Sequence, residues 1–90
     1  MKVLLFKDLN CDICKLMQHE LIDNPPAADL EIINVSRENC SEKAVLYNIN
    51  CYPTILLLDE KDTILNRFEG FIDSKSIDIN IKEHEAKCMV

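Results

Sequence analysis

Two cysteines separated by two residues, Cys11 and Cys14, are the residues of this chain best suited to chemistry. A CxxC pair can exchange disulfides, hold a metal ion or form a structural bridge. The pair follows the apolar run 3–6 and opens a stretch with helical periodicity. The expected apolar face of this helix consists of Ile13, Leu16, Met17 and Leu21. Because the N–H groups at a helix start stabilise a thiolate, this setting favours disulfide exchange. We predict that Cys11 is the exposed nucleophile and that Cys14, one turn further along, is the resolving thiol.

Charged neighbours of the pair are expected to change the pKa of Cys11 in opposite directions. Asp12 places a negative charge beside the thiolate and raises this pKa, whereas Lys7 and Lys15 lower it, weakly if they are exposed to solvent. Together with the helix start, these groups predict a pKa that is lowered only modestly. Such a thiol suits a reductant or a general disulfide exchanger better than a strong oxidant.

A second segment with chemical potential, Cys51-Tyr52-Pro53-Thr54, lies further along the chain. Pro53 opens an apolar strand, where a proline removes one hydrogen bond of the ladder. If the Tyr52–Pro53 bond is cis, the backbone is left free to pair with an extended substrate strand, as in β-strand addition. We therefore predict that Tyr52, Pro53 and Cys51 lie on the substrate-binding side of the cysteine pair.

Two residues of this segment have alternative interpretations. The Tyr52 ring either contacts a substrate or packs against Leu9 or Ile13. Cys51 is either a small apolar filler, which is common for a free cysteine, or a third redox thiol. The sequence leaves both alternatives open.

Hydrophobic periodicity and turn residues predict how these motifs are positioned. The expected order is a strand at 3–6, a helix from Cys11 or Asp12 to the stop at 23–26, a strand at 30–35, a short helix at 41–47, a strand at 54–58, a strand at 63–68 and a final helix capped by Asp73 or Ser74. This βαβαββα order predicts one α/β domain over 1–90, with a four-stranded mixed sheet flanked by helices.

Composition excludes several classes of partner and location. Of the 90 residues, 48% are hydrophobic, as in a folded protein, and the net charge of −6 argues against nucleic acid. The first apolar run is too short for a signal peptide or a membrane span. Five cysteines, an odd number without a secretion signal, favour a reducing compartment, so we expect a cytoplasmic protein. Cys40 is expected to be incidental, and Cys88 to lie on an exposed tail.

The chain resembles the thioredoxin family over nearly its whole length. The resemblance rests on the CxxC pair, on Tyr47 and Ile49 leading into Pro53-Thr54, on the apolar strand after them, and on Gly70 beyond the hairpin. The element order is similar to that of glutaredoxins and of the smallest thioredoxin-like proteins. In the family, the proline that corresponds to Pro53 is cis and faces the cysteine pair.

This resemblance implies a thiol-disulfide oxidoreductase that acts as a protein disulfide reductase. Its substrates would be proteins that contain disulfides, and a flavoprotein disulfide reductase would return electrons to the pair. The resemblance implies no bound cofactor and a monomer.

Several residues depart from the family's pattern. Thioredoxins have Trp-Cys-Gly-Pro-Cys, where this chain has Asn10-Cys11-Asp12-Ile13-Cys14. The buried acid of the family is replaced by Leu5, and its lysine partner by Asn34. Water or Glu20 would then have to relay the proton to Cys14. The Thr-Val-Pro segment and Gly-Gly turn of glutaredoxins are absent as well, so glutathione is not expected to be the main partner.

A function of a different class is the alternative. The same fold could serve as a redox-inactive interaction module, or Cys11 and Cys14, with Cys51 as a third ligand, could hold a soft metal such as copper(I). Zinc is disfavoured, because its sites need four ligands and neither His19 nor His84 has metal-binding spacing.

Overall fold

The computed structural model describes residues 1–8, 10–35 and 41–88, except for the side chains of Ser41, Lys87 and Cys88. The elements are β1 (Lys2–Lys7), α1 (Asp12–Asp23), β2 (Asp29–Asn34), α2 (Ser41–Leu46), β3 (Thr54–Leu58), β4 (Ile64–Glu69) and α3 (Ser74–Cys88). The four strands form one mixed sheet in the order β2-β1-β3-β4. The predicted βαβαββα order and mixed sheet are confirmed. No helix in the described part of the chain is long and apolar enough to cross a membrane.

The two central strands, β1 and β3, are the most apolar of the sheet. β1 pairs in parallel with β2, with Leu5 opposite Ile32, and antiparallel with β3, with Leu5 opposite Ile55. All five residues of β3 are buried, as expected for a strand covered on both faces. β4 pairs antiparallel with β3 and closes the hairpin at the edge. The central pair therefore provides the rigid platform from whose ends the cysteine and proline loops extend.

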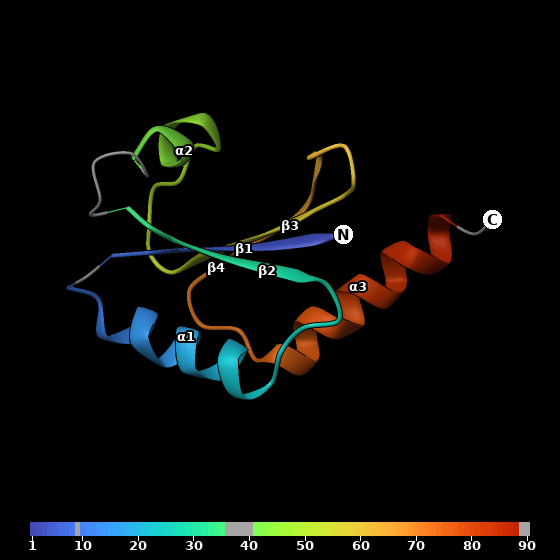
Figure 1. The fold of residues 1–90 in the computed structure, drawn as a ribbon, viewed down its shortest axis with the longest axis horizontal. Coiled ribbons are helices and arrows are strands. Elements are labelled where there is room, and N and C mark those ends of the chain that lie inside the picture. The colour runs from blue at the N-terminus through green and yellow to red at the C-terminus, as the bar shows by residue number, and fades with distance from the viewer. Residues whose placement is uncertain (9, 36–40, 89–90) are drawn as a thin grey trace.

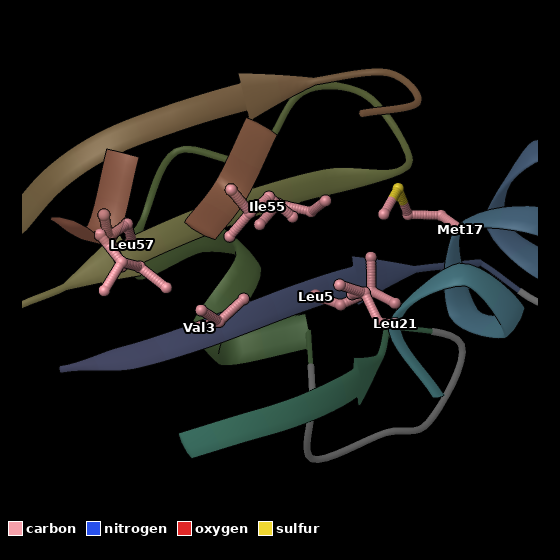
Figure 2. Close-up of a cluster of buried hydrophobic side chains, with 8 residues drawn as sticks. Val3, Leu5, Met17, Leu21, Ile55 and Leu57 are labelled. Atoms are coloured by element: carbon pink, nitrogen blue, oxygen red, sulfur yellow. The ribbon is translucent and has the colours of Figure 1, made fainter. Parts of the chain in front are cut away.

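Helices cover both faces of the sheet (Figure 1), with α1 and α3 on one face and α2 on the other. Alternate residues of β1 and β3 consequently enter two separate cores. The α1/α3-face cluster consists of Val3, Leu5, Met17, Leu21, Ile55, Leu57, Ile77 and Ile81. The α2-face cluster consists of Leu4, Phe6, Ile33, Ala44, Ile49, Leu56 and Leu58. Figure 2 shows Leu5 of β1 and Leu21 of α1 pointing toward one another in the first cluster.

Helix α1 buries a narrower stripe than its sequence suggests. Cys14, Met17 and Leu21 are buried at helical spacing, and Cys11 is the N-cap. Ile13 and Leu16, which the periodicity also assigns to the apolar face, are 51% and 62% exposed. That assignment is wrong, because only a stripe of the helix circumference meets the sheet and residues one position aside lie about 100° away from it.

The last segment is a helix, as its length and charged end predict, although its isoleucines also alternate like a strand. Ile77 and Ile81 are buried in the α1/α3-face cluster, and Ile79 is exposed. The Asp73 carbonyl accepts the first helical bond, from the Ile77 N–H at 3.3 Å, so Asp73 occupies the cap position. Helix α2 begins at Ser41, and Cys40 lies outside the described residues.

Gly70, the only glycine in the sequence, ends β4 with a φ of +89°. No heavy atom lies within 4 Å of a Cβ built there, so substitution meets no steric clash. We predict that Gly70→Ala lowers the free energy of unfolding by about 1 kcal/mol, because alanine disfavours positive φ. Urea unfolding measures the effect, with the exposed turn residue changed in Lys61→Ala as the control. A variant as stable as the wild type would show that this φ does not need glycine.

Candidate redox site

Cys11 and Cys14 meet at the first turn of α1. Their sulfur atoms form a disulfide, with the two Cα atoms 5.2 Å apart. Cys11 has an extended backbone, with φ −107° and ψ 110°, and its sulfur accepts the Cys14 N–H at 3.1 Å. The sulfur thus takes the place that a serine or aspartate oxygen holds at many helix starts.

Exposure distinguishes the two cysteines. Cys11 is half-buried at the N-terminal end of α1, whereas Cys14 is completely buried beneath the first turn of the helix. A substrate can therefore reach the Cys11 sulfur but not that of Cys14. An N–H directed at the Cys11 sulfur favours its thiolate, since hydrogen bonding to a charged form lowers the free energy of that form.

The Tyr52–Pro53 segment forms the opposite side of the site. The peptide bond between Tyr52 and Pro53 is cis, and Pro53 is buried. The Tyr52 carbonyl oxygen lies 3.8 Å from the Cys11 sulfur. The Tyr52 ring packs partly against the α2-face cluster, while Ile13 is largely exposed and Leu9 lies outside the described residues. The structure therefore brings the backbone of Tyr52 to Cys11.

Cys51 is outside the Cys11–Cys14 disulfide and is half-buried. Its sulfur lies 3.7 Å from the Thr54 hydroxyl oxygen, and this hydroxyl donates to the Cys51 carbonyl at 2.6 Å. The Gly70 N–H donates to the Pro53 carbonyl at 2.9 Å. The predicted substrate-binding residues thus lie in a turn that is closed by Thr54 and held at its end by Gly70.

The side chains expected to tune Cys11 have different surroundings. Lys7 donates through its Nζ to the Gln18 amide oxygen, across to α1. Asp12 and Lys15 are exposed, where their charges are screened by water. The Asp8 carbonyl accepts the Cys11 N–H at 3.3 Å and holds the loop before the helix.

Glu20, considered above as a proton relay, is engaged at the other end of α1. Its two carboxylate oxygens accept the Ser74 N–H at 2.9 Å and the Asn24 amide at 3.1 Å. Six residues of helix also separate it from Cys14 by about 9 Å along the axis. Glu20 therefore joins α1 to the start of α3, and its geometry gives no support to a relay role.

A groove next to α2 could not be identified from the sequence. It has a volume of about 460 Å³ and is lined by Asp8, Val35, Ala44, Val45, Asn48, Ile49, Asn50 and Tyr52. Two of these residues, Asp8 and Tyr52, also contact Cys11 through their backbone carbonyls. The lining residues come from separate segments of the chain, so only the tertiary structure brings them together.

No group of three or more histidine, cysteine or acidic side chains within the described ranges is arranged to hold a metal ion. The two sulfurs of Cys11 and Cys14 are bonded to each other. Two bonded cysteine sulfurs offer the making and breaking of one disulfide.

Comparison with known proteins gives structural relatives only. No protein-family model and no curated protein sequence matches the chain. A malarial protein superposes with a TM-score of 0.77 and 25% identity, over 92% of this chain and 94% of the other. Thioredoxin-2 of the malaria parasite gives 0.79 and 24%, over 92% and 82%. Thioredoxin 1 of Thermosipho africanus gives 0.76 and 21%, over the full length of both chains.

These similarities agree with the geometry of the sheet and of the cysteine pair. The sheet order, the three helices and the CxxC pair at the start of α1 match the thioredoxin arrangement expected from the sequence. The chain therefore has a thioredoxin-like fold, with its CxxC pair at disulfide distance, and this combination supports a redox role.

Proposed function

We propose that this protein is a thiol-disulfide oxidoreductase that reduces disulfides in other proteins. The observation that carries the proposal is the difference between its two cysteines. Cys11 is accessible and its sulfur accepts a helix N–H, while Cys14 is fully buried at bonding distance behind it. This is the arrangement that a nucleophile and a resolving thiol require.

The reaction proceeds by two thiolate exchanges. In the first, the Cys11 thiolate attacks a substrate disulfide, a mixed disulfide forms, and one substrate sulfur leaves as a thiolate. In the second, the Cys14 thiolate attacks the Cys11 sulfur and releases the other substrate sulfur. The substrate gains two electrons and the protein ends with the Cys11–Cys14 disulfide, which is the form in this structure.

The remaining parts of the proposal concern partners and location. Tyr52, Pro53 and Cys51 bind the substrate chain, which is supported by the approach of the Tyr52 carbonyl to Cys11. A flavoprotein disulfide reductase returns the two electrons, and the protein acts as a monomer in the cytoplasm.

The direct test is the reduction of insulin disulfides with dithiothreitol as the electron source. We expect the protein to accelerate the precipitation of insulin chains at substoichiometric concentration, because each cycle regenerates the dithiol. The matched control is Cys88→Ser, which removes one thiol at the far end of α3 and should retain the rate. A protein that binds copper(I) stoichiometrically under reducing conditions and does not turn over insulin would favour the metal-binding alternative.

A further inference from the structure

Arg67 of β4 makes an unusual connection across the molecule. Its guanidinium donates to the carbonyl oxygen of Asn48 at 2.9 Å and also to that of Tyr47. The side chain is only 28% exposed, and its ion pair with Glu69 is long, at 3.9 Å. The two carbonyls are therefore the main partners of Arg67.

These carbonyls directly follow α2, in the turn that caps its C-terminal end and contains a left-handed residue. Asn48 has a φ of +56°, and the Ile49 N–H donates back to the Ala44 carbonyl at 2.8 Å. The Asn48 N–H donates to the Val45 carbonyl at 3.1 Å, which completes a Schellman motif. The last carbonyls of a helix have no partner within it, and a planar guanidinium can donate to two of them at once.

Gly70, the residue directly after β4, holds the other end of the segment that leads to the redox site. The segment 47–53 begins at the carbonyls bound by Arg67 and ends at Pro53, whose carbonyl accepts the N–H of Gly70. Between these two anchors lies Tyr52, with its carbonyl 3.8 Å from the Cys11 sulfur. The segment also lines the groove next to α2, in which Asp8 and Tyr52 are the two residues that contact Cys11.

We infer that Arg67 is a positioning residue for substrate binding, because it fixes the segment 47–53 in the place where a substrate chain must pass. The inference rests on the proposed function. Cys11 caps α1 and Cys14 lies within it, and none of the Arg67 hydrogen bonds touches that helix. Loss of Arg67 should therefore impair the binding of an extended polypeptide and leave the intrinsic thiol chemistry intact.

The test compares two substrates of the same reaction. Insulin needs the segment 47–53, whereas a small aromatic disulfide such as 5,5′-dithiobis(2-nitrobenzoate) needs only the Cys11 sulfur. For Arg67→Ala we expect the KM for insulin to rise about tenfold, equivalent to about 1.4 kcal/mol, with the rate on the small disulfide within twofold. Arg67→Lys should recover part of the loss, because the ammonium keeps the positive charge and can still donate to a carbonyl. The recovery should be incomplete, because a lysine lacks the planar fork with which a guanidinium donates to two carbonyls at once. The matched control is Glu69→Gln, which removes the long ion pair, keeps the fork, and should retain the wild-type KM.

Hydrogen exchange supplies a readout that does not depend on turnover. In both Arg67 variants, amide exchange over 48–52 should be faster, while exchange in α1 stays unchanged. An equal loss on both substrates, or unchanged kinetics on both, would overturn the inference, as would faster exchange throughout the chain. A wild-type protein that reduces the small disulfide but not insulin would instead contradict the proposed function itself.

Discussion

Replacing Cys14 with serine is expected to trap substrate proteins on Cys11 as mixed disulfides. The variant keeps the accessible nucleophile and its N–H donor, because that donor is a backbone group. It lacks the buried thiol that would complete the exchange, so the first step proceeds and the second cannot. Incubation with a disulfide-containing protein, followed by non-reducing electrophoresis and mass spectrometry, should locate the adduct on Cys11.

Replacing Cys11 with serine should instead abolish both adduct formation and turnover. We expect a loss on the order of 100-fold or more, because a hydroxyl provides no anionic nucleophile near neutral pH, where an ordinary thiol is already a few per cent ionised. Cys88→Ser is again the control. If Cys14→Ser forms its adduct on Cys51, or if Cys11→Ser retains turnover, the assignment of the nucleophile is incorrect.

A substitution at Leu5 should have the largest effect on stability. Leu5 is fully buried in the α1/α3-face cluster, on a strand paired on both sides. Leu5→Ala should lower the free energy of unfolding by about 2–5 kcal/mol, the usual cost of such a truncation. Leu5→Asp should cost more, because it also takes a carboxylate out of water.

Equilibrium unfolding in urea, with all proteins in the oxidised state, measures these differences. Leu5→Met conserves volume and should cost less than about 1.5 kcal/mol. Ile79→Ala, on the exposed face of α3, should change stability by less than about 0.5 kcal/mol. A Leu5→Asp variant as stable as the wild type would mean that this core tolerates the acid found at this position in thioredoxins. An unstable Leu5→Asp variant would show that this core, which is apolar around Leu5, does not accommodate that acid.

The sequence predicts most of the fold because its signals are local. Apolar runs give the central strands, two prolines end the first helical segment, and a polar turn connects the last two strands. The sequence-based predictions are wrong where tertiary contacts decide which side chains are buried. Periodicity places Ile13 on the buried face of α1, yet the sheet covers only the stripe that contains Cys14 and Met17.

The sequence alone determined three things: the cysteine pair at a helix start, the proline before the central strand β3, and the order of the elements. Each of these depends only on residues that are neighbours in the chain. Only the tertiary structure decided that the Tyr52 carbonyl meets the Cys11 sulfur and that Arg67 holds the end of α2. It also decided that Glu20 binds the start of α3. These contacts join residues 41, 19 and 54 positions apart, so they depend on the packing of the helices against the sheet, which no local pattern encodes.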